Sequence, residues 1–274
     1  MAPSTVVHSD IVYGSEEGQT LDLSIPTPIP PNGCPLLVFV HGGAWRTRPP
    51  PTVLALFAHE LIVASNYTLA VAIVRYRLSP QVQHPHHVDD VVRALGYLVD
   101  KSEEYGNYDP RRIILAGHSA GATICAQIAM DSQYLRQGLG VGHASDKLRR
   151  AIQGVCGLQG IYSLNELVKT FPEYTEFVAP AFGEAPAEWT SASPTHFPVT
   201  DWERGMRWLV IWSEEDELVD GEQALQFVKR VRQGQPKDIR FVDRVAWGSH
   251  DGVLEREEVW RALVDFCWQA AGMA

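Results

Sequence analysis

Short apolar runs alternate with helical patterns along most of this chain. The expected strands are residues 36–40, 69–76, 113–117, 152–158, 207–212 and 239–242, and the expected helices lie near 52–65, 88–101, 119–130, 221–232 and 255–270. Strands that are apolar along their whole length are buried on both faces, so helices must cover both sides of the sheet. The pattern predicts an α/β fold with a mostly parallel central sheet, preceded by an antiparallel hairpin of residues 6–13 and 21–25.

Length and charge limit what the chain binds. Its 274 residues suit one large α/β domain, residues 1–274. The 33 acidic against 23 basic residues give a formal charge of −10, which argues against nucleic acid as a partner. No segment approaches the length of a membrane span. We expect a small-molecule substrate and no nucleic-acid or membrane partner, and the sequence leaves a homodimer open.

The N-terminus and the cysteines bear on location. Residues 1–5 lack the charged and then apolar stretches of a secretory signal. The four cysteines, at 34, 125, 156 and 267, show no paired spacing, and those at 125 and 156 fall in apolar segments expected to be buried. Free thiols without a targeting segment predict a cytoplasmic protein.

Residues 117–121 carry the motif with most chemical content. They read Gly117-His118-Ser119-Ala120-Gly121, between an apolar strand pattern and a helical pattern. In a G-x-S-x-G turn of this kind the serine is held in a strained conformation with its hydroxyl at the end of the sheet. Glycines flank the serine because side chains would collide in so tight a turn. The motif predicts that Ser119 is the nucleophile of a serine hydrolase.

A second glycine motif follows the strand of residues 36–40. It reads His41-Gly42-Gly43-Ala44-Trp45. Attack on a carbonyl creates an oxyanion, and backbone N–H groups in such a loop can stabilise it together with the residue after the nucleophile. We expect these donors to be Gly42, Gly43 and Ala120. We expect His41 and His118 to be structural, and Trp45 to form an aromatic wall of the substrate pocket, with a core position as the alternative.

The acid and the base follow in the chain. Asp216 stands just beyond the strand of residues 207–212, and His250 is the only histidine after it. A serine, an acid and a histidine in this order suit a catalytic triad. Asp220 competes as the acid, but with Gln223 it resembles a capping box that opens a helix. We therefore assign Asp216, and we expect Glu214, Glu215 and Glu217 to be solvated.

Other polar clusters have simpler interpretations. His84, His86 and His87 invite a metal site, but no cysteine pairs accompany them and Pro85 interrupts their spacing. We expect a loop that enters a helix, and no metal or organic cofactor. Arg75 and Arg77 could bind a substrate carboxylate, although ion-paired or solvated roles are favoured. Trp247 is left open between pocket and core.

Residues 159–203 interrupt the alternation of strands and helices. They contain Phe171, Tyr174, Phe177, Phe182, Trp189 and Phe197. The interval is too long for an ordinary loop and too aromatic for a disordered linker. We expect a small lid over the active-site end of the sheet, or an excursion with its own local core.

With these motifs placed, the chain resembles the α/β-hydrolase superfamily over nearly its whole length, and the hormone-sensitive-lipase-like esterases within it. The segment Tyr76-Arg77-Leu78-Ser79-Pro80, with His84-Pro85 and Asp89-Asp90 after it, is similar to a segment of that group. Two departures are the HGGAW loop in place of HGGG and the lack of the group's helical N-terminal cap.

A short hydrolase with an HGGxW loop resembles the kynurenine formamidases of the fungal type. The resemblance implies hydrolysis of N-formyl-L-kynurenine to kynurenine and formate in tryptophan catabolism. The alternatives are a general carboxylesterase acting on short-chain esters and, more remotely, a non-catalytic ligand receptor on the same fold. A serine peptidase is a further alternative, but nothing in the sequence suggests a propeller or a docking domain.

Overall fold

A computed structural model describes residues 2–31, 33–105, 108–140, 142–200 and 205–273. Within these ranges a single sheet runs through the molecule in the order β1-β2-β4-β3-β5-β6-β7-β8. Its strands are β1 (Ser4–Val12), β2 (Thr20–Thr27), β3 (Leu36–Val40), β4 (Ala70–Arg75), β5 (Ile113–His118), β6 (Ile152–Leu158), β7 (Arg207–Ser213) and β8 (Asp238–Val245). Neighbouring strands pair in parallel from β4 through β3 and β5 to β8. The first two strands are antiparallel, because β1 pairs with β2 and β2 pairs with β4 in opposite directions. The predicted hairpin and the mostly parallel sheet are confirmed.

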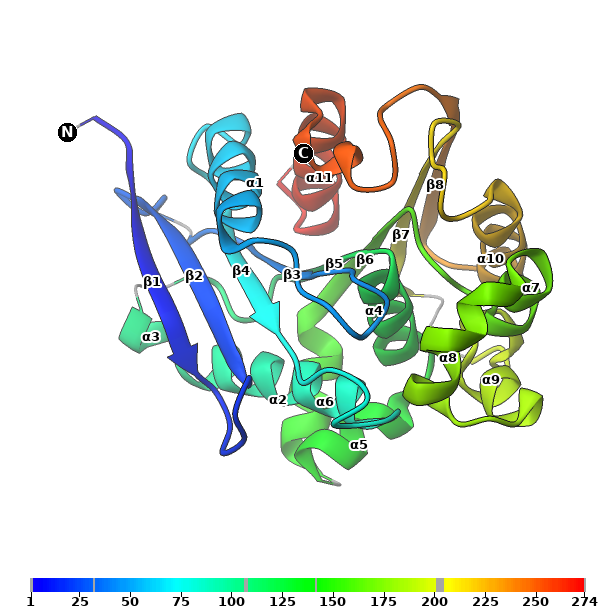
Figure 1. The fold of residues 1–274 in the computed structure, drawn as a ribbon. Coiled ribbons are helices and arrows are strands. Elements are labelled where there is room, and N and C mark those ends of the chain that lie inside the picture. Colours follow the sequence, from blue (N-terminus) through cyan, green and yellow to red (C-terminus); the bar gives the residue numbers. More distant parts are fainter. Residues whose placement is uncertain (1, 32, 106–107, 141, 201–204, 274) are drawn as a thin grey trace.

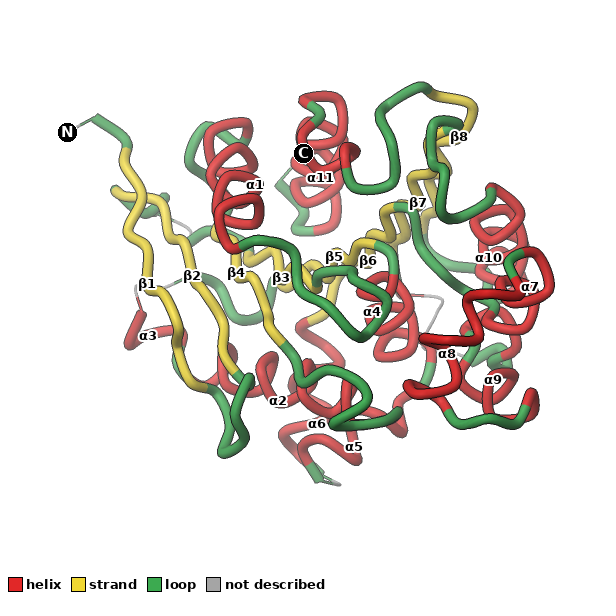
Figure 2. Tube along the Cα trace, viewed as in Figure 1, coloured by secondary structure: helices red, strands yellow, loops and turns green. Residues whose placement is uncertain are grey.

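Helices cover both faces of this sheet (Figure 1). They are α1 (Pro51–Ala64), α2 (His86–Asp100), α3 (Ser102–Tyr105), α4 (Ala120–Met130), α5 (Ser132–Leu139), α6 (His143–Ala151), α7 (Leu164–Thr170), α8 (Thr175–Phe182), α9 (Pro186–Ala192), α10 (Gly221–Gln233) and α11 (Glu257–Ala270). Figure 2 shows α1 and α11 together on one face, with α2 and α4 on the other.

Alternate residues of each central strand enter two different cores, because successive side chains of a strand point to opposite faces. Leu37 and Phe39 of β3 pack with α1 and α11, for instance against Phe57. Leu36 and Val38 pack with α2, α4 and α10 on the other face. All five residues of β3 are buried. The continuous apolar pattern of these strands therefore reflects burial from both sides.

The described part of the segment 159–203, residues 159–200, folds into α7, α8, α9 and two short 3₁₀ turns, and residues 201–203 lie outside the described residues. The three helices contact one another and lie together beside α4 and α10 (Figure 1). Its buried aromatic side chains belong to the same core as α2 and α4; they are Phe177, Phe182, Trp189 and Phe197. The expected alternative of a separate local core is therefore wrong, because these rings extend the main core.

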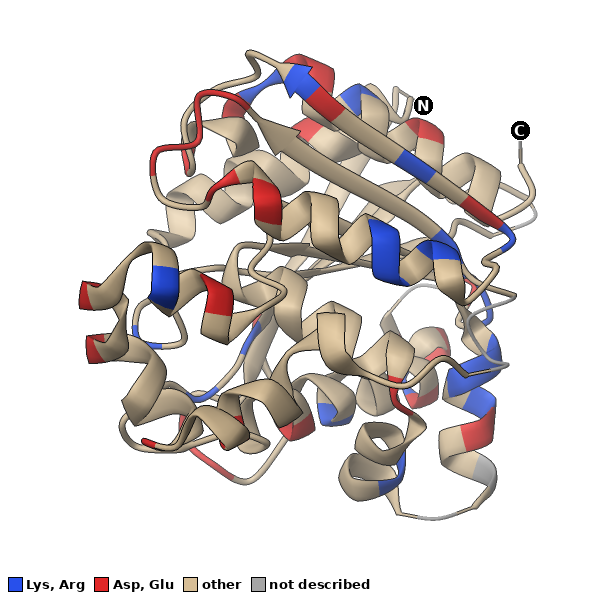
Figure 3. Ribbon diagram, turned by 90° about the vertical axis from the view of Figure 1, so that its right-hand side faces the viewer, with Lys and Arg blue, Asp and Glu red and all other residues tan. Residues whose placement is uncertain are grey.

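Charge is spread over the outside of the molecule. Figure 3 shows acidic and basic residues alternating along the edge strand β8 and interspersed on the helices in view. This edge carries four charged side chains, those of Asp238, Arg240, Asp243 and Arg244. Charged side chains on an edge strand discourage pairing with a strand of another chain. The four cysteines are buried and form no disulfide. Among the described helices, none combines the length and the apolar character that crossing a bilayer requires.

Candidate active site

Ser119 lies in the sharp turn between β5 and α4. Its backbone has φ 53° and ψ −121°, a conformation that a residue with a side chain adopts only under constraint. A Cβ on Gly117 would come closer than 3.0 Å to the backbone of Gly121, and one on Gly121 would meet the carbonyl oxygen of Val40 equally closely. The two glycines therefore allow the close backbone approach that the turn requires.

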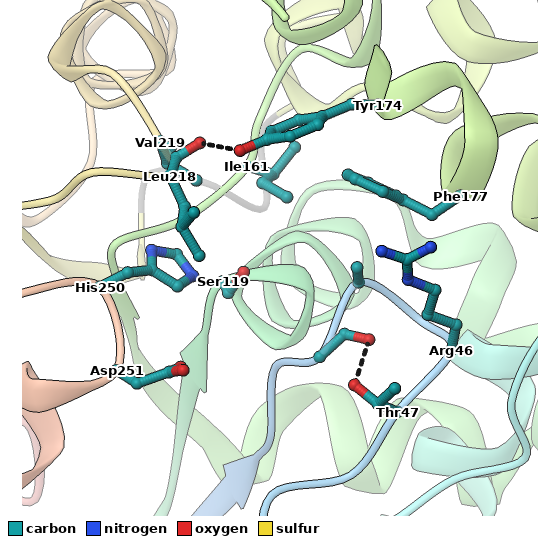
Figure 4. Close-up of a pocket in the computed structure, with 12 residues that line it drawn as sticks. Arg46, Thr47, Ser119, Ile161, Tyr174, Phe177, Leu218, Val219, His250 and Asp251 are labelled. Atoms are coloured by element: carbon teal, nitrogen blue, oxygen red, sulfur yellow. Dashed lines mark hydrogen bonds between the residues drawn. The ribbon is translucent and has the colours of Figure 1, made fainter.

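Asp216 and His250 meet beyond the carboxyl ends of β7 and β8. Nδ1 of His250 lies 3.0 Å from each carboxylate oxygen of Asp216, whose side chain is fully buried. Oδ1 of Asp216 also accepts from the N–H groups of Leu218 and Val219, both at 2.9 Å. A carboxylate that accepts the proton of Nδ1 leaves the lone pair on Nε2. Figure 4 shows the imidazole of His250 turned toward Ser119.

The loop that carries His250 is held from several sides. Nε2 of the buried His118 donates to the carbonyl oxygen of His250 at 2.8 Å. Burial, and then the proximity of His250, lower the pKa of His118 to about 3, so this ring stays neutral. His118 thus has the structural role expected of it, and it fixes the backbone of His250.

Two glutamates have a role that the sequence did not suggest. Glu217 Oε2 accepts from the N–H of His250 at 3.0 Å, and Glu215 Oε2 accepts from that of Gly248 at 2.7 Å. The hydrogen bond from His250 lowers the pKa of Glu217. Glu215 and Glu217 are exposed, as expected, and each also accepts a hydrogen bond from the backbone of the loop that carries His250. Glu214 remains exposed.

The loop after β3 is anchored by its carbonyl groups. His41 Nδ1 donates to the carbonyl of Gly42 at 2.7 Å, and the hydroxyl of Tyr76 donates to the carbonyl of His41 at 3.2 Å. The His41 ring also stacks on Tyr76, with centroids 4.6 Å apart, and burial lowers the pKa of His41 to about 4. His41 therefore braces the loop, as expected.

The same anchors orient the N–H groups of the loop. In a trans peptide the C=O and the following N–H point in opposite directions. With the carbonyls of His41 and Gly42 engaged, the N–H groups of Gly42 and Gly43 are turned the other way. Within the described part of the chain, neither has an acceptor, nor does the N–H of Ala120, the first residue of α4.

A cavity of about 310 Å³ opens above Ser119 (Figure 4). The loop after β3, the segment 159–203 and the loops after β7 and β8 all contribute to its wall. Its lining residues are Gly43, Ala44, Arg46, Thr47, Ser119, Ile161, Tyr174, Phe177, Leu218, Val219, His250 and Asp251. The cavity thus joins the serine and the histidine to two aromatic rings and one arginine.

Trp45 is not among these lining residues. Its side chain is 1% exposed and packs edge-on against Phe182, with centroids 4.8 Å apart, and against Phe177 at 6.4 Å. The expectation of an aromatic wall at Trp45 is corrected, because its indole turns into the core beneath the segment 159–203. Phe177 and Tyr174 supply aromatic rings to the cavity instead.

The remaining candidates separate into structural roles. Asp220 Oδ1 accepts from the N–H of Glu222 at 2.9 Å and caps α10, as expected. Arg77 binds Asp90 at 2.7 Å and Arg75 binds Asp22, so both arginines are ion-paired. The N–H of Trp247 donates to Ser213 Oγ, and its ring packs on the core formed with α1 and α11.

The three clustered histidines do not converge. His84 Nε2 bonds the hydroxyl of Tyr134, His87 Nε2 bonds Ser79, and the exposed His86 faces Asp89. Among the described residues, one group of metal-ligand atoms does lie within 4.8 Å of one another, and it consists of His118, His250 and Asp251. Because a metal there would occupy ring nitrogens at the site, it would compete with His250 as a base.

Comparison with known proteins places this geometry in a family. Residues 21–231 match the BD-FAE family. A kynurenine formamidase of Meyerozyma guilliermondii is 31% identical over 84% of this chain and 83% of its own. One from Eremothecium gossypii is 32% identical over 83% of this chain and 91% of its own. A truncated carbohydrate esterase from gut microbiota shares the fold, with a TM-score of 0.79 and 17% identity over 97% and 96% of the two chains.

The matched region contains the serine turn, the loop after β3, Asp216 and the segment 159–203, and His250 follows it. The chain belongs to the BD-FAE family: it is a hydrolase with the α/β-hydrolase fold, of the hormone-sensitive-lipase-like esterase type, and it resembles kynurenine formamidase.

Proposed function

We propose that this hydrolase cleaves the formamide of N-formyl-L-kynurenine to give kynurenine and formate, with Ser119, His250 and Asp216 as its catalytic triad. The observation that carries the proposal is the bond of His250 to the buried Asp216 beside a strained Ser119. The kynurenine formamidases at 31% and 32% identity support the choice of substrate.

In the proposed mechanism, Ser119 Oγ attacks the formyl carbon while Nε2 of His250 takes the hydroxyl proton. Asp216 holds the imidazole in the required tautomer and stabilises the imidazolium that forms. His250 then gives the proton to the nitrogen of the leaving arylamine as the C–N bond breaks. A formyl ester of Ser119 remains.

Water completes the reaction. His250 removes a proton from a water molecule as it attacks the formyl ester, and returns that proton to Ser119 Oγ as formate leaves. In both steps the N–H groups of Gly42, Gly43 and Ala120 stabilise the oxyanion, and loss of one such donor typically costs about 2.7–4 kcal/mol. No metal or organic cofactor enters this scheme.

The cavity suits a small aromatic substrate. Its volume of about 310 Å³ lies at the lower end of the range for small-molecule sites. Tyr174 and Phe177 can contact an aromatic ring, and both come from the segment 159–203. We propose that this segment is a lid that shapes the pocket, within a single domain of residues 1–274.

The substrate is tested by comparing kcat/KM for N-formyl-L-kynurenine with kcat/KM for short p-nitrophenyl esters on the purified protein. A preference of several orders of magnitude for the formamide is expected. A preference for the esters would favour the carboxylesterase alternative, which the structural similarity to esterases also supports. Absence of turnover with either class would indicate the non-catalytic receptor.

The absence of a metal requirement is tested separately. Dialysis against a chelator is expected to leave turnover unchanged, whereas a sulfonyl fluoride is expected to abolish it. Loss of activity on dialysis, with recovery on addition of Zn²⁺, would contradict the mechanism. It would point to His118, His250 and Asp251, whose ligand atoms lie within 4.8 Å of one another.

A further inference from the structure

Arg46 has no role in the chemistry described above, yet it lines the same cavity as Ser119. Among the described residues that line the cavity, it is the one arginine or lysine. It stands three residues after Gly43, on the loop that follows β3. Figure 4 shows its guanidinium beside Phe177, across the cavity from His250, with Ser119 between them.

Two neighbours hold the guanidinium in this place. Its Nη1 donates to Oε1 of Glu176, on α8, at 2.8 Å. Its central carbon lies 5.2 Å from the centroid of the Phe177 ring, within the range of a cation–π contact. That contact uses the ring face and no N–H donor. Among the described residues Arg46 has no other side-chain hydrogen-bond partner, so its further donors are available to a ligand.

The ion pair between Arg46 and Glu176 is weak. The Arg46 side chain is 45% exposed and that of Glu176 is 65% exposed, so water screens their attraction. A carboxylate inside the cavity would lie in a less hydrated place, and a guanidinium can bind it through two parallel hydrogen bonds. A ligand carboxylate can therefore displace the Glu176 carboxylate from Arg46, or bind Arg46 beside it, at little cost in free energy.

The surroundings of Arg46 are acidic. The chain carries a formal charge of −10, and Asp251 adds an acidic group to the cavity wall. The carboxylate of a substrate in the cavity meets repulsion from these groups. The Arg46 guanidinium is the group that can offset the repulsion.

We propose that Arg46 is a specificity-determining residue that binds the carboxylate of an aromatic substrate, and that Glu176 occupies this guanidinium while the cavity is empty. The aromatic ring of the substrate then lies against Phe177 and Tyr174, and its acyl carbon reaches Ser119. The assignment rests on the proposed function, since it names the feature by which that site would select an aryl formamide bearing a carboxylate.

The test compares charged and neutral substrates with the same reacting group. 4-(2-Formamidophenyl)-4-oxobutanoate is N-formyl-L-kynurenine without its ammonium group and keeps the carboxylate, and 2-formamidoacetophenone keeps the ring, ketone and formamide without the carboxylate. Arg46→Met is expected to lower kcat/KM for the former about ten- to a hundred-fold, mainly through KM, because one charge-assisted pair is lost. Turnover of the neutral analogue is expected to stay unchanged. Arg46→Lys is expected to recover part of the loss.

Glu176→Gln gives the opposite prediction. The Glu176 carboxylate competes with the substrate carboxylate for Arg46. Its removal is expected to lower KM for 4-(2-formamidophenyl)-4-oxobutanoate and to leave kcat/KM for the neutral analogue unchanged. If Arg46 and Glu176 only hold the loop after β3 against α8, both variants lower kcat/KM for both substrates alike, and the proposal is overturned. Arg261→Met is the matched control, because Arg261 pairs with Glu257 on α11, is 72% exposed and lies outside the cavity lining.

An ester pair separates this proposal from the proposed function. 4-Acetoxybenzoate has a carboxylate on its leaving group, and its methyl ester does not. The two esters therefore differ by one carboxylate charge, as the two formamides do. If the wild-type protein cleaves neither formamide, the proposed function fails, and Arg46→Met must still lower kcat/KM for the charged ester alone. If the wild type cleaves the formamides and Arg46→Met leaves the charged-to-neutral ratio unchanged, the Arg46 assignment alone fails.

Discussion

At the scale of single residues, two aspartates four positions apart have different surroundings. Asp216 is fully buried at its side chain and accepts from His250, Leu218 and Val219. Asp220 accepts from the N–H of Glu222 at the first turn of α10. The first set of contacts suits a carboxylate that orients a histidine, and the second suits a helix cap.

Substitution of each aspartate by asparagine separates these roles. Asp216→Asn is expected to keep the fold and to lower kcat by about 10⁴, as in the known serine-protease example, because the amide favours the wrong tautomer of His250. Asp220→Asn is expected to be nearly neutral, since asparagine caps helices about as well as aspartate. Steady-state kinetics and thermal unfolding measure both. An inactive Asp220→Asn beside an active Asp216→Asn would reverse the assignment.

At the scale of elements, the crossing of α4 and β3 depends on one glycine. A Cβ on Gly121 would be closer than 3.0 Å to the carbonyl oxygen of Val40, and 2.7 Å from that of His41. Backbone atoms at the end of a central strand cannot move aside as a flexible side chain can. The missing side chain at residue 121 thus lets α4 begin directly beneath the loop that follows β3.

Gly121→Ala is therefore expected to destabilise the fold by more than about 1–3 kcal/mol, the usual cost of overpacking in a core. Gly140→Ala is the control, because a Cβ there meets no atom within 4 Å, although its φ of +81° adds some strain. Urea unfolding measures both free energies. Equal effects of the two substitutions would show that the contact with Val40 is not decisive.

The central elements, and the meeting of Asp216 and His250 near Ser119, could be predicted from the sequence, because continuous apolar runs, the serine turn and the order of these residues are readable in it. Burial on both faces leaves the same signal in each central strand, as in residues 36–40. The helices α5 and α6 were not predicted, since they are short and polar. The core position of Trp45 and the hydrogen bond that Glu217 accepts from His250 could not be predicted, because they depend on α8 and on the loop that carries His250, far away in sequence.

At the scale of the whole molecule, the buried His41, His87 and His118 and the half-buried His84 make stability depend on pH. Burial lowers the pKa of His41 and His84 to about 4, and that of His87 and His118 to about 3. In the unfolded chain their pKa values are about 6.5. Below pH 6.5 the unfolded chain binds protons that the folded chain does not, so this stability is full above about pH 6.5 and is lost as pH falls toward 4.

We expect the free energy of unfolding to fall between pH 6.5 and 4 by up to about 1.4 kcal/mol per pH unit for each of these histidines. Urea unfolding at several pH values measures the slope. His84→Gln can keep a hydrogen bond to Tyr134 and removes one titrating group, so its slope should be smaller by up to one proton. A wild-type free energy that stays level over this range would contradict the buried, neutral state of these rings.

The proposed mechanism depends on Ser119 as the nucleophile, and covalent labelling tests this role most directly. The protein is treated with a fluorophosphonate, its activity toward N-formyl-L-kynurenine is followed, and mass spectrometry of the intact chain and its peptides locates the adduct. The account predicts one adduct per chain, on Ser119, that forms in proportion to the loss of activity, and none in Ser119→Ala. Full activity in a chain completely labelled at Ser119, or inactivation by an adduct elsewhere, would contradict it.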